Sequence, residues 1–148
     1  MKPIGVLVNP AANRGRGNLV GEQVFSQLAK AGIPAINLSA ESAIAAANKA
    51  QVAISDQEIS GVIAVGGDGT TQLGVNICVP NQIPLGIVPA GSGNDQAREL
   101  GIELGNPKSA IDNILQSLDS PKRVDVMRVA TDVREFWSFG SISAGFDA

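Results

Sequence analysis

Three short glycine-rich segments contain the residues whose types and spacing could do chemistry in this chain. They are Asn9–Gly17, Gly66–Thr70 and Gly91–Asp95. Glycine lets backbone N–H groups approach an anion closely, and a helix that begins just after such a loop adds partial positive charge. One such segment alone is more often a simple turn. Three in a small domain predict a site for phosphate groups, and the arginines of the first segment would add formal positive charge to it.

Each glycine-rich segment follows a short apolar run that is typical of a buried strand, at residues 4–8, 62–65 and 84–89. A further strand is expected at 35–38. Helices are expected at 20–29, at 42–54 with Ser39 or Ser42 as N-cap, from about 70 through Ile77, from 94 to about 101, and after Asn106-Pro107. Alternating strands and helices predict an α/β fold with an open, mainly parallel sheet, in which ligands bind at the carboxyl ends of the strands.

The pattern of the chain changes after residue 120. Residues 123–129 alternate polar and apolar side chains, a second extended run covers 136–142, and Asp132 falls at the turn between them. This arrangement predicts an antiparallel hairpin. We therefore expect an α/β nucleotide-binding domain over 1–120, followed by a hairpin over 121–148.

Composition excludes several classes of function. The 148 residues fit one domain, and the net charge of −3 with only 3% aromatic residues argues against nucleic-acid binding. The chain contains no histidine, which excludes Ser-His-Asp triads and histidine-ligated metals within it. Its one cysteine, Cys78, excludes an internal disulfide and is expected in the core. No apolar run approaches the ~20 residues that span a bilayer.

Common nucleotide-binding motifs fit the segments poorly. Nothing in the chain supplies the lysine of a Walker A loop. Gly15–Gly21 reads GxGxxxG, one residue longer than the dinucleotide fingerprint, and its first glycine lies too far past the strand for the tight turn. Hydride transfer is therefore disfavoured.

The sequence Gly66-Gly67-Asp68-Gly69-Thr70 resembles a signature shared by diacylglycerol-kinase-type lipid kinases and NAD kinases. Other segments separate the two groups. Asn9–Gly15, Gly91–Asp95 with Ala97 and Arg98, Val124-Asp125 and Gly145–Ala148 are similar to motifs of the lipid kinases, in order and spacing. The chain thus resembles the N-terminal, nucleotide-binding half of a diacylglycerol/sphingosine-type lipid kinase. An NAD kinase and a non-catalytic nucleotide-binding regulatory module remain the alternatives.

The resemblance implies a set of residues that contact ATP. They are Asn9, Pro10, Ala11, Ala12, Asn13, Ser39, Gly66, Gly67, Asp68, Gly69, Thr70, Thr71, Gln72 and Ser92. It also implies a charge network at the domain junction, formed by Arg14, Asp95, Arg98 and Asp125, although Asp95 could simply be an N-cap and Arg98 a solvated residue. Asp68 is the implied catalytic residue, acting through Mg²⁺ or by orienting its loop; the alternative is a turn residue that caps the next helix.

The implied reaction is transfer of the γ-phosphate of ATP to a lipid hydroxyl such as that of diacylglycerol or a sphingoid base, with Mg²⁺ as the metal. In the family, the general base and most Mg²⁺-binding acids belong to a C-terminal β-rich domain, so no metal ligand is assigned here and Asp147 is not taken as the base. We expect the isolated 148 residues to be inactive and apolar surface on the hairpin to be exposed.

The resemblance also implies partners. A lipid substrate at the membrane surface and the C-terminal domain are expected, a homodimer is left open, and the location would be cytoplasmic and peripheral to the membrane. The chain departs from the family's usual residues at Leu73, Gln96 and Asn13, where glutamate, phenylalanine and glycine are common. These departures leave the details of adenine and ribose contact open and could mark a branch with a different acceptor.

Overall fold

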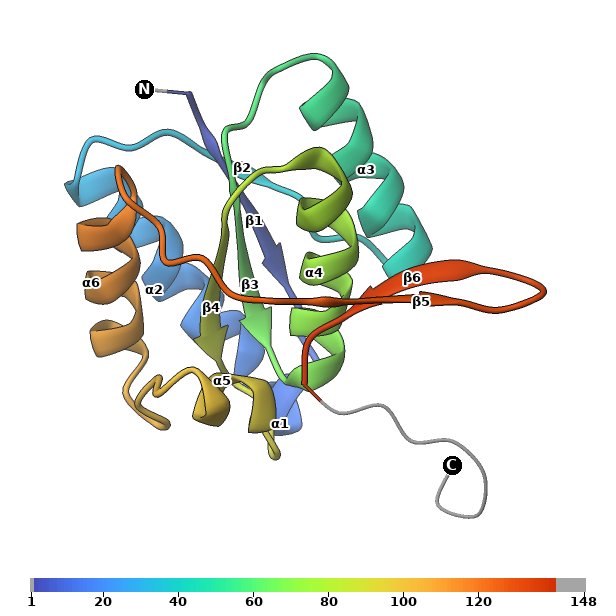
Figure 1. The fold of residues 1–148 in the computed structure, drawn as a ribbon. Coiled ribbons are helices and arrows are strands. Elements are labelled where there is room, and N and C mark those ends of the chain that lie inside the picture. Colours follow the sequence, from blue (N-terminus) through green and yellow to red (C-terminus); the bar gives the residue numbers. More distant parts are fainter. Residues whose placement is uncertain (1, 141–148) are drawn as a thin grey trace.

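The computed structural model describes residues 2–140, with Asn13 described by its backbone alone. Its main sheet has four parallel strands in the order β2-β1-β3-β4 (Figure 1). The strands are β1 (Ile4–Val8), β2 (Ala35–Asn37), β3 (Val62–Gly66) and β4 (Leu85–Pro89). The predicted parallel α/β fold is therefore confirmed, and all four strands end at the same edge of the sheet.

Helices cover both faces of this sheet. They are α1 (Ala12–Gly15), α2 (Gly17–Lys30), α3 (Ala43–Ser55), α4 (Asp68–Asn81), α5 (Asp95–Glu99) and α6 (Pro107–Ser117). Helices α2 and α6 lie on one face, whereas α3 and α4 lie on the other (Figure 1). Helical crossovers between parallel strands leave the loops at the strand ends free to form a site.

The alternation of side chains along the strands divides the core into two layers. On β1, Ile4 and Val6 pack towards α2 and α6, whereas Leu7 packs towards α3 and α4. On β3, Val65 joins the first layer and Val62 the second. Full burial of such a branched side chain stabilises the fold by roughly 1.5–3 kcal/mol, so the two layers hold the strand ends in place.

Capping residues fix where two helices begin. The hydroxyl oxygen of Ser42 accepts the backbone N–H of Ala45 at 3.1 Å, and Asn106 caps α6 by accepting the N–H of Ser109 at 3.1 Å. Ser42, and not Ser39, is thus the N-cap of α3. The first glycine-rich segment also differs from the expected turn because it contains the single helical turn α1, which ends where Arg14 adopts a left-handed φ of 57°.

The predicted hairpin is present as β5 (Met127–Ala130) and β6 (Glu135–Ser138), which pair antiparallel. Its first strand is shorter than expected, since residues 123–126 do not pair. Figure 1 shows the chain leaving α6, passing in front of the edge strand β4, and reaching α4, beyond which the hairpin projects. The segment Gly145–Ala148 lies outside the described residues.

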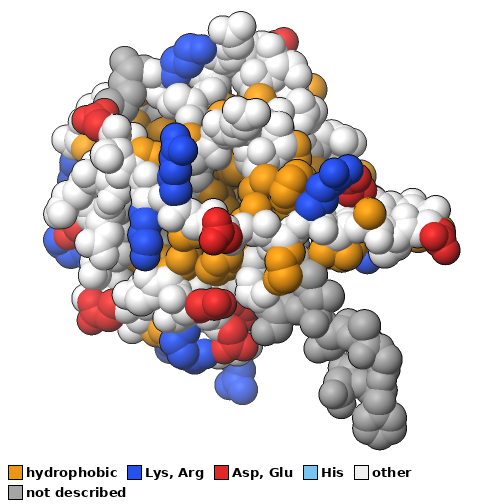
Figure 2. Space-filling model, viewed as in Figure 1, with side chains coloured by type: hydrophobic (Ala, Val, Ile, Leu, Met, Phe, Trp, Pro, Cys, Tyr) orange, Lys and Arg blue, Asp and Glu red, His pale blue; other side chains and the backbone are white. Residues whose placement is uncertain are grey.

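Some of the surface near the hairpin is apolar, as predicted. Val124 and Met127 are 45% and 43% exposed, and Val133 at the hairpin turn is 88% exposed. Figure 2 shows hydrophobic side chains gathered on this face among Lys and Arg side chains. No helix within residues 2–140 combines the length and the apolar character that a membrane crossing would need.

Candidate active site

The three glycine-rich segments meet at the carboxyl edge of the sheet. Strand β3 pairs with β1 on one side and with β4 on the other, so its loop lies between the other two. The last pair on the β3–β4 side joins Gly66 to Pro89, which places Gly67 and Gly91 next to each other. The sheet order thus brings together residues that are more than 80 positions apart in the sequence.

The second and third glycine loops touch through their backbones. A Cβ atom on Gly91 would lie 3.0 Å from the backbone nitrogen of Gly67 and closer still to its Cα. Real Cβ atoms do not approach backbone this closely, so no side chain fits between the loops. This contact gives a physical reason for glycine at Gly91 and makes the two loops one continuous wall.

Asn94 closes the third loop. Its side chain accepts the N–H of Gly91 at 2.9 Å and donates to the carbonyl oxygen of Gly91 at 2.7 Å, and its own φ of 60° is left-handed. Asparagine tolerates this conformation better than most residues. Because Asn94 is also buried, the loop is held in one shape. The sequence predicts Asn94 as part of the third motif but not its role in closing the loop.

Asp68 links the second loop to α5. Its Oδ1 accepts the backbone N–H of Gln96 at 3.0 Å. Burial tends to raise the pKa of the Asp68 carboxyl, but hydrogen bonds from the backbone of Gln96, Asp95, Asn94 and Asp68 itself outweigh that effect, so the pKa is lowered. Asp68 therefore caps α5, rather than the α4 helix in which it lies, and orients two loops at once.

The hydroxyl residues after Asp68 are held close to the loop. Thr70 and Thr71 are buried, and the N–H groups of both reach the carbonyl oxygen of Gly67 at 3.0 Å. The hydroxyl of Thr71 donates to the same oxygen at 3.3 Å. In contrast, Gly69 is exposed, and a Cβ added there would meet nothing within 4 Å. The space in front of Gly69 is therefore open to a ligand.

The first loop forms a compact turn beside the second. Asn9 donates its N–H to the carbonyl oxygen of Val65 at 2.9 Å, and its side chain accepts the N–H of Ala11 at 3.0 Å. A Cβ on Gly17 would collide with the carbonyl oxygen of Asn9. The loop places Pro10 and Ala11 at the surface and buries Ala12.

Two serines were predicted to contact ATP. The hydroxyl oxygen of Ser39 accepts the N–H of Val8 at 2.9 Å, so Ser39 lies at the end of β1, next to the first loop. Ser92 lies exposed in the third loop. Both therefore belong to the edge that carries the loops, and their contact with ATP stays a prediction.

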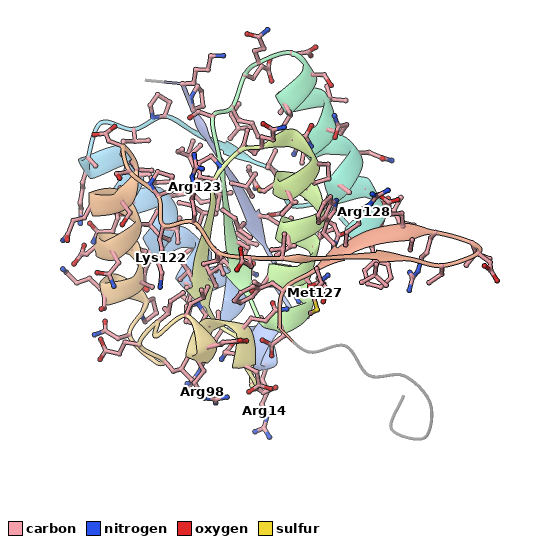
Figure 3. All side chains as sticks on the ribbon, in the orientation of Figure 1. Arg14, Arg98, Lys122, Arg123, Met127 and Arg128 are labelled. Atoms are coloured by element: carbon pink, nitrogen blue, oxygen red, sulfur yellow. The ribbon has the colours of Figure 1, made fainter. Side chains whose placement is uncertain are left out.

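Only part of the predicted charge network is formed among the described residues. Asp95 and Arg98 form an ion pair at the start of α5, and both side chains are largely exposed. Exposed pairs of this kind stabilise a fold by about 0–1 kcal/mol. Within residues 2–140, neither Arg14 nor Asp125 has a salt-bridge partner. Figure 3 shows Arg14 and Arg98 pointing outwards from the end of the molecule that carries α1 and α5.

The hairpin forms the remaining wall of a cleft of about 530 Å³ in front of the second loop. The cleft is lined by Asp68, Gly69, Gln72, Asp95, Gln96, Glu99, Phe136, Ser138, Phe139 and Gly140. It therefore combines the loop carboxylate with aromatic side chains of the hairpin. A second hollow of about 460 Å³ lies on the outer side of α2, away from the glycine loops.

Three amide side chains fix the hairpin to the helices. Asn76 accepts the N–H of Trp137 and donates to its carbonyl oxygen, both at 2.8 Å, and Gln72 also donates to that oxygen. Gln96 donates to the carbonyl oxygen of Phe139 at 2.7 Å and to Gln72 at 3.3 Å. Sequence spacing does not predict this role of the amides, since only the fold brings Gln72, Asn76 and Gln96 against the hairpin.

The described residues offer no preformed metal centre. Within residues 2–140, no group of three Cys, Asp or Glu side chains is close enough to hold a metal ion. Mg²⁺ commonly uses one or two carboxylates together with substrate phosphates. The carboxylate of Asp68 lies beside an open loop and therefore fits this way of binding Mg²⁺.

Comparison with known proteins identifies the class to which this fold and site belong. A family model, the diacylglycerol kinase catalytic domain, matches residues 3–129. The chain belongs to this family. The predicted resemblance is therefore confirmed.

Relatives of known name agree with this assignment. A diacylglycerol kinase of Mycobacterium tuberculosis is 31% identical over 98% of this chain, and one of Bacillus subtilis is 31% identical over 87%. The crystal structure of a diacylglycerol kinase from Bacillus anthracis covers 84% of this chain with a TM-score of 0.66 and 28% identity. The chain spans less than half of each relative, at 46%, 42% and 45% of their lengths.

Proposed function

We propose that this chain is the nucleotide-binding part of an ATP-dependent lipid kinase that transfers the γ-phosphate to a lipid hydroxyl. The observation that carries the proposal is the meeting of three glycine loops at one sheet edge, with Gly67 against Gly91 and open space in front of Gly69. Membership of the diacylglycerol kinase catalytic-domain family supports the same reaction class.

In this proposal the phosphates of ATP lie in front of Gly69, at the start of α4. The first N–H groups of a helix have no partner within that helix, and they favour an anion. The N-terminal N–H groups of α5 are already taken by Asp68. The phosphates would therefore use α4, and the side chains of Arg14 and Arg16 would supply the nearest formal positive charge of the first loop.

Asp68 acts in this proposal by holding the loops in register. A bare carboxylate next to phosphate is unfavourable. Mg²⁺ bound together with ATP would neutralise the charge of the phosphates next to Asp68. The Asp68 carboxylate and the phosphates would be its ligands. Positioning and electrostatic stabilisation account for most of the catalysis in phosphoryl transfer.

The general base would come from sequence outside the described residues. A base must reach the hydroxyl whose proton it accepts. The carboxylates that line the cleft are Asp68, Asp95 and Glu99. Asp68 is engaged by backbone N–H groups and Asp95 by Arg98, which leaves them poorly suited to that step. Glu99 is exposed and would act as the base only if a lipid hydroxyl came within its reach. The resemblance to lipid kinases implies a base in a further domain, so we expect activity to need the longer chain that the relatives have.

A substrate assay of the natural protein at full length tests the proposal. We expect phosphate transfer from ATP to diacylglycerol or to a sphingoid base, and the lipid that is phosphorylated names the acceptor. Transfer to NAD and to neither lipid would support the NAD kinase alternative. ATP binding without transfer to any of the three acceptors would support a nucleotide-binding regulatory module.

A further inference from the structure

The amide cluster of Gln72, Asn76 and Gln96 lies between the nucleotide loops and the hairpin. Asn76 holds both the N–H and the carbonyl group of Trp137, so the backbone of β6 is fixed to the third turn of α4. Gln72 reaches the same carbonyl oxygen from one turn earlier in α4. The hairpin is therefore attached to α4 by directional hydrogen bonds.

Gln96 joins this cluster to the carboxylate of the second loop. Its backbone N–H donates to Asp68, while its side chain donates to Phe139 and to Gln72. One residue thus touches the Asp68 loop, the helix α4 and the strand end of the hairpin. A displacement of Asp68 would move Gln96, and Gln96 would move the aromatic wall of the cleft.

The bonding of Gln96 also fixes the orientation of its amide. Both acceptors, the Phe139 carbonyl and Gln72 Oε1, face Nε2, so the nitrogen must point towards the hairpin. Its Oε1 is buried and has no hydrogen-bond partner among the described residues. Because a buried acceptor without a hydrogen-bond partner destabilises the fold, this glutamine is not explained by stability alone.

We propose that Gln72, Asn76 and Gln96 are positioning residues, which couple nucleotide binding at the Asp68 loop to the position of the hairpin. The inference rests on the proposed function and concerns a coupling within the same site. It predicts that Asn76 and Gln96 affect turnover more than ATP affinity, because their side chains bond to the hairpin and neither belongs to the residues expected to contact ATP.

The test uses the natural protein at full length with 5-fluorotryptophan incorporated, and the Trp137→Phe variant assigns the Trp137 fluorine resonance. ATP with Mg²⁺ is titrated into the wild type, into Gln96→Met and into Asn76→Leu, and ATP binding is measured separately by calorimetry. Methionine keeps the length of glutamine, leucine keeps the branching of asparagine, and both remove the donor. Gln116→Met, at an exposed position on α6, is the matched control.

We expect ATP to shift the Trp137 resonance in the wild type and in Gln116→Met. In Gln96→Met and Asn76→Leu the shift should be lost while ATP still binds, and kcat should fall roughly 10- to 100-fold with little change in KM for ATP. Equal shifts in all variants, or no shift in a wild type that binds ATP, would overturn the inference alone. A wild type that binds no ATP would overturn the proposed function and the inference with it.

Discussion

Asp68 is held by backbone N–H groups that come from a different loop. This explains why its carboxyl has a lowered pKa despite partial burial. A carboxyl whose pKa is lower in the folded state stabilises the fold above its unfolded pKa of about 4. That contribution disappears as the pH falls through the lower, folded pKa.

Replacement of Asp68 by alanine removes both its charge and the hydrogen bonds that its carboxylate accepts. We expect Asp68→Ala in the natural full-length protein to abolish kinase activity, at a cost of about 1 kcal/mol in stability from the lost cap. Near-normal turnover of Asp68→Ala would remove Asp68 from the mechanism. Asp119→Ala, at an exposed position, should match the wild type in both assays.

Asp68→Asn keeps an acceptor for the N–H of Gln96 but removes the charge. Its stability should fall less than that of the wild type as the pH is lowered below about 4, because the wild type loses the ionised form of Asp68 there. Urea unfolding at pH 6 and at pH values below 4 measures both curves. Parallel curves would mean that Asp68 has the same pKa in the folded and unfolded states.

Cys78 offers a second prediction for a single residue. It lies buried in the layer between the sheet and α3 and α4, and burial raises the pKa of its thiol to about 12. Because only the thiolate reacts rapidly, the thiol of the folded chain should not react with a disulfide reagent at pH 8. It should react at once in urea. Rapid reaction without urea would show that α4 opens readily.

At the scale of elements, the backbone contact between the loops after β3 and β4 gives a matched pair of glycine variants. Gly91→Ala would place its Cβ against the backbone of Gly67, so we expect a loss of roughly 1–3 kcal/mol in stability. Gly69→Ala meets open space in the first turn of α4. It should keep or slightly increase stability, since alanine favours helix over glycine by up to about 1 kcal/mol.

The two variants should differ in ATP binding as well. Gly69→Ala should bind ATP weakly although it is well folded, because its methyl group occupies the space proposed for the phosphates. Thermal unfolding and calorimetric ATP titration, run on the same preparations, separate the two effects. If Gly69→Ala bound ATP as tightly as the wild type, the phosphates would have to lie elsewhere.

Local patterns in the sequence predicted most of the elements. The apolar runs at 4–8 and 62–65 became β1 and β3, and Asn106-Pro107 began α6 as expected. The short helix α1 was missed because its Asn-Arg-Gly composition is typical of a turn. The hairpin's first strand was predicted too long because alternation continues through 123–126, where no neighbouring strand is available to pair.

The candidate site was predicted by motif rather than by geometry. The motifs placed Asp68, Gly91 and Asn94 in one site, but they could not show that Asp68 caps α5. That bond depends on β3 and β4 being neighbours. The amides Asn76 and Gln96 were not assigned at all, since their partners lie more than 40 positions away and are backbone groups, which leave no trace in side-chain spacing.

At the scale of the whole molecule, the chain spans less than half the length of its relatives. The described residues provide loops for phosphate, whereas the general base is expected in a further domain. We expect the 148 residues alone to bind ATP weakly and to transfer no phosphate to lipid. A radiolabelled-ATP assay with diacylglycerol vesicles measures this, and robust transfer by these residues alone would contradict it. The natural full-length protein is the positive control.

The contact between Gly67 and Gly91 also limits how such a site can change over evolutionary time. Gly91 cannot gain a side chain unless β3 and β4 separate, and that separation would break the pairing of Gly66 with Pro89. We therefore expect position 91 to stay glycine as the site diverges. New acceptor specificity is therefore expected to arise from the hairpin wall, where Phe136 and Phe139 can be exchanged one at a time.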